Sequence, residues 1–321
     1  MSDSNTPPRV HDPRRPDKAF GCGFLMGTAD AIPGVSGGTM ALILGIYELF
    51  IEALNTVLRL PVSLRSEEGR RELKAAFLFL IPLGAGVGTA LFLATRLLVG
   101  RREEQGLIQD PATAPYFYAF FFGLVVVSAG VPWNRIREHS LRTRLLALAG
   151  VAGAFVFAGL EKLQHEPETW MLAGGGALAI SVMLLPGISG SLLLVLLNQY
   201  QAVVEALHDR NIIRLLVFVA GVGTGAVLFV PLLRRLLRTA HDPTMAVLTG
   251  LMVGSLRALW PWKENYDHTA GSMRNLALER IGDAGAPTLL VLLAMIGGGA
   301  VILVLMAVER RHAGGRELRR P

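Results

Sequence analysis

Residues 32–38 read Ile-Pro-Gly-Val-Ser-Gly-Gly, and residues 185–191 read Leu-Pro-Gly-Ile-Ser-Gly-Ser. The second copy follows the first by 153 positions, and at the same offset Tyr47 falls on Tyr200. Further matches keep the same order with small shifts in offset, pairing 86–89 with 221–224 and 132–133 with 261–262. Matches that keep one order indicate an internal repeat. We therefore expect two repeats, at 20–165 and 170–312, between a disordered basic tail at 1–19 and a basic tail at 313–321.

The composition indicates a membrane protein. Of the 321 residues, 52% are hydrophobic and 17% are charged, which is more apolar than a water-facing surface tolerates. Several apolar stretches have about the length that a helix needs to cross roughly 30 Å of hydrocarbon; they lie at 75–98, 116–132, 145–160, 215–233, 245–260 and 288–308. The net charge of +6 does not indicate nucleic-acid binding, because the basic residues lie in short loops between these stretches. The predicted class is an all-α integral membrane protein.

Each half begins with an apolar segment that is broken at its Pro-Gly pair. Proline disfavours a helical conformation in the residue before it, and glycine frees the backbone. The first leg, at 20–32, is too short to cross the bilayer alone. We expect each half to consist of a re-entrant helical hairpin, broken at Pro-Gly, and three transmembrane helices. Two alternatives remain open: both legs cross, or the end of the second leg, 34–54, bends along the membrane surface.

The basic residues predict the orientation of the chain. If each hairpin enters and leaves on one face, 21 of the 31 lysine and arginine residues lie on the face that holds both termini. The positive-inside rule places this face in the cytoplasm. Three crossings per half is an odd number, so we expect the second half to be inverted relative to the first. The two Pro-Gly tips then meet near the middle of the bilayer, as in many secondary transporters.

The residues after each break have the chemistry of an anion site. The first N–H groups of a helix lack intrahelical partners and carry a partial positive charge. Glycines let an oxyanion approach the backbone there, and hydroxyl groups add donors. The alternative is that the breaks only allow close packing of the hairpins, with the serines as N-caps. The candidate substrate-binding residues are Gly34, Ser36, Gly37, Gly38, Thr39, Gly187, Ser189, Gly190 and Ser191.

Two carboxylates are candidates for ion coupling. Asp30 lies just before the first break, whereas Met183 occupies the matching position in the second half. A carboxylate within the membrane must be paired or hydrated. Asp30 is therefore a candidate for binding H⁺ or Na⁺, with capping of the nearby backbone N–H groups around Ser36 and Gly37 as the alternative. Glu48 has a weaker claim, because its position far along the second leg places it near the membrane surface.

The sequence contains no recognisable catalytic constellation. The histidines lie in tails, loops or leg ends, without a second ligand at metal-binding spacing. The single cysteine, Cys22, forms no internal disulfide, and neither a Gly-x-Ser-x-Gly elbow nor a Walker loop is present. We therefore expect no enzyme activity, no metal site and no cofactor.

The first break carries a family resemblance. Residues 29–39 read Ala-Asp-Ala-Ile-Pro-Gly-Val-Ser-Gly-Gly-Thr and are followed by Gly-Ile-Tyr-Glu at 45–48. This pattern resembles the opening signature of the bacterial polyprenyl-phosphate transporter family, formerly a domain of unknown function. Residues 186–191 are similar to the second signature of that family, and the likeness covers about 20–310. Asn198 is a departure, since the first half has Gly45 at the equivalent place.

The resemblance implies translocation of undecaprenyl phosphate, the lipid carrier of cell-wall synthesis, across the bacterial cytoplasmic membrane for reuse. The implied partners are a polyprenyl phosphate lipid and the membrane. Coupling to H⁺ or Na⁺ through Asp30 is our inference from the residues. A membrane phosphatase would need a nucleophile and a basic clamp, which the apolar segments lack. The remaining alternative is an ion-coupled symporter of a small soluble anion, because nothing in the sequence recognises a lipid tail.

Overall fold

The computed structural model describes residues 15–31, 36–94, 107, 110–266, 274–277, 279–281 and 286–317. Within these residues the chain forms helices and connecting segments but no strand, apart from one isolated antiparallel bridge between Lys263 and Asn275. Gly34 and most of the two predicted tails lie outside the described residues.

Apart from the four-residue helices α4 and α7, which have no counterpart among the described helices of the second half, the helices of the two halves follow the same order. Those of the first half are α1 (Pro16–Asp30), α2 (Gly37–Ile43), α3 (Tyr47–Leu58), α4 (Leu60–Ser63), α5 (Glu67–Ala94), α6 (Ala114–Ser128), α7 (Gly130–Trp133) and α8 (Leu141–Phe157). Those of the second half are α9 (Met171–Met183), α10 (Gly190–Leu196), α11 (Tyr200–His208), α12 (Ile212–Thr239), α13 (His241–Ser255) and α14 (Thr288–Glu317). The predicted boundaries at residues 20 and 312 fall inside α1 and α14.

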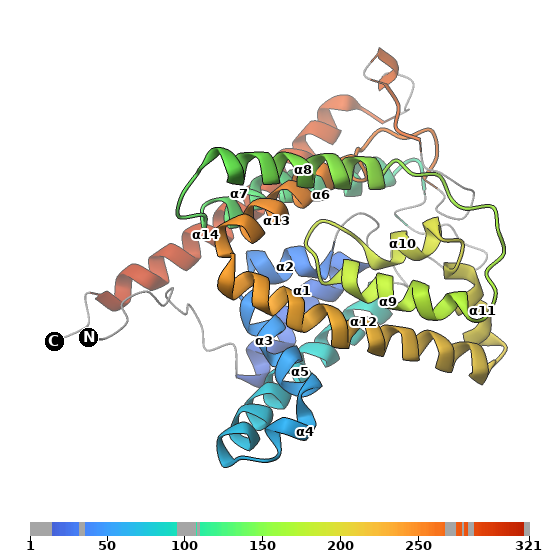
Figure 1. The fold of residues 1–321 in the computed structure, drawn as a ribbon. Helices are drawn as coiled ribbons and strands as arrows, with labels where there is room; N and C mark the ends of the chain where they lie inside the picture. The colour runs from blue at the N-terminus through green and yellow to red at the C-terminus, as the bar shows by residue number, and fades with distance from the viewer. Residues whose placement is uncertain are drawn as a thin grey trace.

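Within each half, the first helix packs along the first long one. Helix α1 contacts α5, and α9 contacts α12 in the same way (Figure 1). The matched glycines Gly86 and Gly221 lie at these two interfaces. A side chain at Gly86 would collide with the Phe20 carbonyl of α1, and one at Gly221 with the Ala173 carbonyl of α9. Small residues let the two backbones approach closely, so matched residues in the sequence make matched interfaces.

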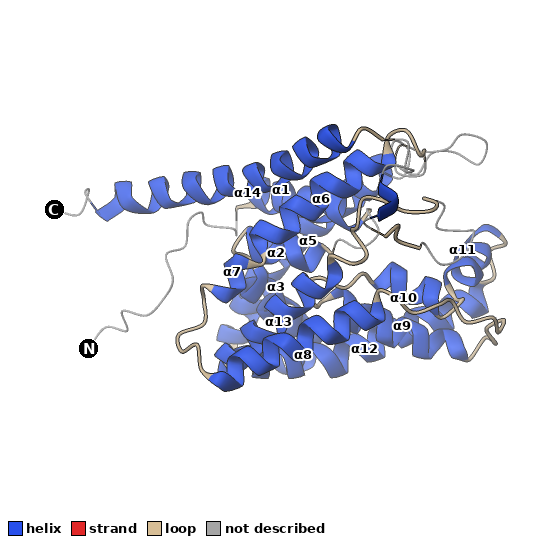
Figure 2. Cartoon of the chain, turned by 90° about the horizontal axis from the view of Figure 1, so that it is seen from above, coloured by secondary structure: helices blue, strands red, loops and turns tan. Residues whose placement is uncertain are grey.

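The remaining long helices pair across the two halves. Helix α6 packs along α14, and α13 packs along α8. The repeat also pairs Gly123-Leu124 with Gly250-Leu251. A side chain at Gly123 would collide with the Met295 carbonyl of α14, and one at Gly250 with the Ala147 carbonyl of α8. Each half therefore contributes a helix to the other, and the halves are interlocked. In both overall views α7 and α11 lie toward opposite ends of the molecule (Figures 1 and 2).

The described helices confirm an all-α chain that carries membrane-length segments. By length and apolar composition, three described helices can cross a bilayer, namely Glu67–Ala94, Ala114–Trp133 and Ile212–Thr239. A fourth candidate is the bent pair Gly190–Leu196 and Tyr200–His208. The predicted stretches 145–160 and 245–260 form α8 and α13, which have 17 and 15 residues.

The second leg of each broken segment is interrupted early rather than near its end. Helices α10 and α11 meet at an angle of 99°. The bend contains Asn198 with φ of 57°, and the equivalent break between α2 and α3 contains Gly45 with φ of 68°. Both values lie in the left-handed region, which glycine adopts freely and asparagine tolerates better than most residues. Asn198 therefore departs from Gly45 in sequence but preserves the same backbone turn.

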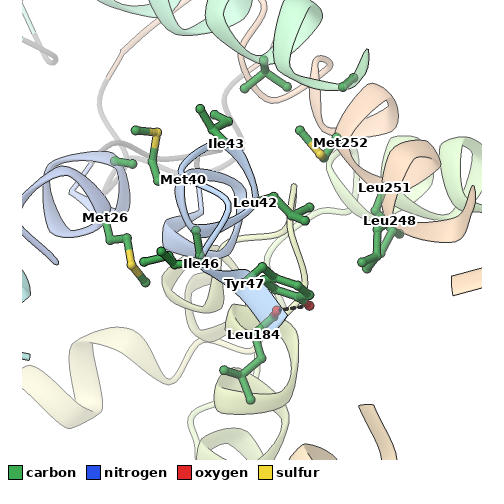
Figure 3. Close-up of a cluster of buried hydrophobic side chains, with 14 of the residues drawn as sticks. Met26, Met40, Leu42, Ile43, Ile46, Tyr47, Leu184, Leu248, Leu251 and Met252 are labelled. Carbon is green, nitrogen blue, oxygen red and sulfur yellow. Dashed lines mark hydrogen bonds between the residues drawn. The ribbon is translucent and has the colours of Figure 1, made fainter. Parts of the chain in front are cut away.

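The core is centred on the first hairpin. All seven residues of α2 are buried, and Tyr47 at the start of α3 is fully buried. Tyr47 lies among Met26, Leu42 and Ile46, and its hydroxyl points to the Leu184 carbonyl just before the second break (Figure 3). The second break is thus packed against the first hairpin.

Candidate functional site

The two predicted helix breaks contact each other directly. Thr39 Oγ1 accepts a hydrogen bond from the Gly187 N–H at 2.9 Å. The Ser36 hydroxyl donates a hydrogen bond to the carbonyl oxygens of Met183 and Leu185, each 3.3 Å from its Oγ. Both hydroxyl side chains are fully buried. Backbone groups freed by the second break are therefore paired with side chains of the first half, as buried polar groups require.

Gly187 is required by both conformation and space. Its φ is +88°, and a Cβ atom built on it would lie 2.7 Å from the Leu251 carbonyl oxygen and from Met252 Cα. The second break therefore lies against α13. Gly38 is similarly close to the second break, because a Cβ there would lie 3.3 Å from the Leu184 carbonyl oxygen.

Asp30 caps the start of α2. Its Oδ1 accepts the Gly37 N–H at 2.5 Å, and Ser36 Oγ accepts the Gly38 N–H at 3.1 Å. A side chain at Gly37 would meet the Asp30 carboxylate, with Oδ2 only 2.5 Å from the added Cβ. The first N–H groups of α2 are therefore already bonded to groups of the protein itself. This geometry corresponds to the capping role that the sequence left open for Asp30.

The start of α10 differs in this respect. Ser189 Oγ accepts the Leu192 N–H at 3.4 Å and lies 2.8 Å from Ser191 Oγ. Gly190 and Ser191 occupy the places of Gly37 and Gly38, yet in the described structure no acceptor bonds their N–H groups. Met183 replaces Asp30 and supplies no carboxylate. The second half thus retains two backbone donors and an exposed hydroxyl, that of Ser191.

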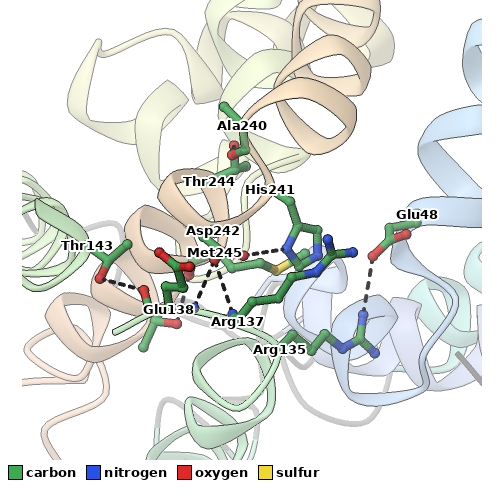
Figure 4. Close-up of polar contacts among 11 residues, drawn as sticks. Glu48, Arg135, Arg137, Glu138, Thr143, Ala240, His241, Asp242, Thr244 and Met245 are labelled. Atoms are coloured by element: carbon green, nitrogen blue, oxygen red, sulfur yellow. Dashed lines mark hydrogen bonds and ion pairs between the residues drawn. The ribbon is translucent and has the colours of Figure 1, made fainter. Parts of the chain in front are cut away.

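Glu48 lies apart from this junction. It is on α3, and its Oε1 lies 3.7 Å from Arg135 Nη1 after α7 (Figure 4). A neighbouring contact ties the same region to α13, because Asp242 Oδ2 accepts the N–H groups of Arg137 and Glu138 at 3.2 and 3.1 Å. Glu48 pairs with Arg135 and Asp30 bonds the Gly37 N–H, so the two candidate ion-coupling residues are not brought together.

Sequence reasoning missed two sets of contacts. Tyr47 bonds the backbone beside the second break, with 2.9 Å between its hydroxyl and the Leu184 oxygen; its place in the repeated motif was the available signal. Glu52 forms a two-bond ion pair with Arg234, at 2.6 and 2.7 Å. Nothing in the sequence alone pairs these two residues, since they are far apart in the chain and belong to different halves.

The described residues hold no group of three histidine, cysteine, aspartate or glutamate side chains placed for a metal ion. A groove of about 480 Å³ lies along α5, and it contains none of the candidate site residues. It is lined chiefly by apolar side chains with Arg70 and Lys74 beside them. The described candidate substrate-binding residues therefore lie at the junction of the two breaks and not in this groove.

Comparison with known proteins places the chain among polyprenyl-phosphate transporters. A polyprenyl-phosphate transporter of Vibrio cholerae serotype O1 is 34% identical over 299 residues, which cover 88% of this chain and 94% of that protein. A polyprenyl-phosphate transporter of Staphylococcus aureus is 30% identical over 259 residues, covering 74% of this chain and 84% of that protein. No solved structure matches the chain. A family model described as undecaprenyl phosphate translocase-like matches residues 26–276, and the chain belongs to this family.

Proposed function

We propose that this protein carries undecaprenyl phosphate back across the bacterial cytoplasmic membrane, so that the lipid carrier is reused in cell-wall synthesis. The observation that carries the proposal is the junction of the two breaks, where Thr39 meets Gly187 and the N–H groups of Gly190 and Ser191 have no acceptor in the described structure. A phosphate monoester needs such donors, and its long tail can stay in lipid while the headgroup crosses. The names of the two relatives support a polyprenyl phosphate as the substrate class.

We further propose that the halves are inverted repeats, each a re-entrant hairpin with three crossing helices. The matched helix pairs and matched interface glycines support this arrangement, and so does the position of α7 and α11 toward opposite ends of the molecule. The excess of basic residues on one face supports a cytoplasmic location for that face and for both termini. Broken helices that meet between inverted repeats are a known setting for substrate sites.

The headgroup is proposed to bind between the breaks. Backbone donors and hydroxyls act here rather than a helix dipole, because α10 has only seven residues. On the side of the second half the donors are the N–H groups of Gly190 and Ser191 and the hydroxyls of Ser189 and Ser191. Gly187 lies beside them, with its N–H bonded to Thr39. The first half contributes Ser36, Thr39 and the glycines at 34, 37 and 38, which carry no side chain of their own between an oxyanion and the backbone.

Asp30 is proposed to link ion binding to headgroup binding. In the first half its carboxylate occupies the donor, the Gly37 N–H, whose counterpart in the second half is unbonded in the described structure. Binding of H⁺ or Na⁺ weakens the hold of the carboxylate on that N–H, which then becomes available to an oxyanion. Glu48, ion-paired with Arg135, is the second and weaker proposed ion-coupling residue.

The test is a flipping assay in liposomes with short-chain polyprenyl phosphate. We expect Ser191→Ala to weaken headgroup binding by about 1 kcal/mol, roughly fivefold, the net worth of one hydrogen bond. Ser181→Ala is the matched control, because that hydroxyl bonds only within α9, and we expect wild-type flipping. Transport of a soluble anion without lipid flipping would instead identify a symporter, and release of inorganic phosphate from the lipid would identify a phosphatase.

A further inference from the structure

The two halves have the same order of helices but different exposure at equivalent positions. Tyr47 on α3 is 0% exposed, whereas Tyr200 at the same place on α11 is 45% exposed. One turn further along, Ile51 is 0% exposed and its counterpart Val204 is 36% exposed. The same face of the second leg is thus buried in the first half and open in the second. Composition does not explain the difference, because both members of each pair are of similar type.

The second leg also makes more helix contacts in the first half than in the second half. Helix α3 packs against α5 of its own half and against α12 of the other half, and α2 contacts α6 and α7. The substantial helix contacts of α10 and α11 in the described structure are to α9, to α12 and to each other. Helix α3 therefore packs against the opposite half, whereas α11 has no substantial helix contact there in the described structure.

An ion pair holds the closed side together. Arg234 of α12 bonds both carboxylate oxygens of Glu52 on α3, at 2.6 and 2.7 Å, and Arg238 Nη2 lies 3.3 Å from Oε1. Two parallel bonds from a guanidinium group fix orientation as well as distance. The pair of Glu48 with Arg135 adds a second tie at the same end.

The open side lacks both ties. Glu205, the counterpart of Glu52, is exposed and forms no ion pair in the described structure. Gln201 stands in place of Glu48 and carries no charge. The two ends of the molecule therefore differ in charge pairing in the same way as they differ in burial.

We propose that Glu52, Arg234 and Arg238 form a gate of the transport cycle, and that the structure has this gate closed and the α11 end open. The proposal rests on the transport function above. In the alternate state the gate breaks, α3 moves away from α12, and α11 packs onto the opposite half as α3 does here. The repeat then places the Tyr200 hydroxyl on the carbonyl of Ala31, just as Tyr47 bonds Leu184 in this state. Glu52 is a positioning residue and does not contact the substrate.

The test measures thiol accessibility at one pair of equivalent positions. In a Cys22→Ala background, single variants Val204→Cys and Ile51→Cys are labelled with a water-soluble thiol reagent in the purified full-length protein. With the gate intact, Val204→Cys reacts faster than Ile51→Cys. We expect Glu52→Gln to slow labelling at 204 and to speed it at 51, several-fold in each case, because the population shifts toward the alternate state.

Glu205→Gln is the matched control, since it removes the equivalent carboxylate where the described structure has no ion pair, and we expect both labelling rates to stay unchanged. The exchanged variant Glu52→Arg with Arg234→Glu should restore the wild-type order of rates. Arg238→Gln removes only the contact with Glu52 Oε1 and should change the two labelling rates in the same direction but by less. This variant tests the gate if Glu52→Gln folds poorly.

Faster labelling at both positions in Glu52→Gln, or equal effects of Glu52→Gln and Glu205→Gln, would overturn the gate. Lipid flipping is measured separately on the same preparations. A reciprocal shift in labelling without flipping of polyprenyl phosphate would retain the gate and reject the substrate, so the two proposals fail independently.

Discussion

Asp30 and Met183 occupy equivalent positions, and the difference between them decides whether a side chain bonds the first N–H group of the helix after each break. The sequence left two roles open for Asp30. In the structure its carboxylate accepts a hydrogen bond from the Gly37 N–H at 2.5 Å. That contact is the capping role, but it does not remove ion binding, because a carboxylate that holds a backbone donor can also be protonated. The sequence identified both the residue and the N–H groups around Ser36 and Gly37 as its possible partners, but it could not decide between capping and ion binding, since that depends on how the chain turns between α1 and α2.

Replacing Asp30 separates the two roles. Asparagine retains an oxygen that can accept the Gly37 N–H, so we expect Asp30→Asn to fold with near wild-type stability and to lose any dependence of transport on pH or Na⁺. Alanine retains no acceptor, and Asp30→Ala should lose about 1 kcal/mol of stability as well. Thermal unfolding and flipping at several pH values measure the two effects. Coupling that persists in Asp30→Asn would leave capping as the role of this residue.

Lys263 is a second residue whose role depends on its surroundings. It lies after α13, outside the candidate membrane spans, and is only 4% exposed. Its ammonium donates to the Ala258 carbonyl at 3.0 Å and to Asn275 Oδ1 at 2.9 Å, and it lies 5.0 Å from the centre of the Tyr118 ring. Burial lowers the pKa of Lys263 from 10.5 to about 7. The sequence placed this lysine in a loop and carried no indication of its burial.

This lowered pKa predicts how stability depends on pH. Between about pH 7 and 10.5 the unfolded chain holds a proton on Lys263 that the folded protein has released. Stability therefore rises with pH across this window, loses the gain as pH falls back from about 10.5 to 7, and does not depend on this group below about pH 7. Lys263→Met should flatten the rise, whereas the exposed Lys74→Met should leave it unchanged. Unfolding midpoints from about pH 6 to 10 measure the slope; an equal slope in Lys263→Met and wild type would contradict the assignment.

Among the helices, the sequence predicted the Pro-Gly breaks but not the later interruptions between α2 and α3 and between α10 and α11. Gly45 and Asn198 are both residues that accept a left-handed backbone, with φ of 68° and 57°. Compared only as letters, they look like a mismatch in the repeat. Compared by the backbone conformation that they permit, they agree, and the residue types alone are enough to make that comparison.

The equivalence of these positions can be tested by exchange. Gly45→Asn places in the first half the residue that the second half already uses, so we expect a change in stability of roughly a few tenths of a kcal/mol. Gly45→Val should destabilise the protein by about 1–2 kcal/mol, because a β-branched residue is strained in the left-handed region. Gly45 is exposed, so crowding does not confuse the comparison. Equal thermal midpoints for the two variants would show that the bend does not depend on this backbone conformation.

At the scale of the whole molecule, the internal repeat was the most informative feature of the sequence. It indicated the two halves and the residues that meet at the breaks, because equal sequence makes equal interfaces, as at Gly86 and Gly221. It did not indicate the difference between the halves, since Tyr47 and Tyr200 are the same residue in different surroundings. The repeat predicts the interfaces that the two halves have in common. The conformational state depends on contacts between the two halves, such as that of Glu52 with Arg234.

The inversion of the halves makes a prediction about sidedness. Glu68 lies in the first turn of α5 and Asp209 lies between α11 and α12, and α5 and α12 each have 28 residues. In the proposed arrangement the chain crosses three times between them, through α5, α6 and α8, and the second hairpin returns to its own side. An odd number of crossings puts the two residues on opposite faces.

Single cysteines at these positions, in the Cys22→Ala background, report the sidedness in intact cells. Both side chains are exposed, and both variants remove one negative charge, so each is the control for the other. We expect an impermeant thiol reagent to label Asp209→Cys from outside and to label Glu68→Cys only after the membrane is permeabilised, because the positive-inside rule places the α4–α5 loop in the cytoplasm. Labelling of both cysteines from outside, or of neither before permeabilisation, would mean that the halves are parallel, and the breaks would then enter the membrane from the same face.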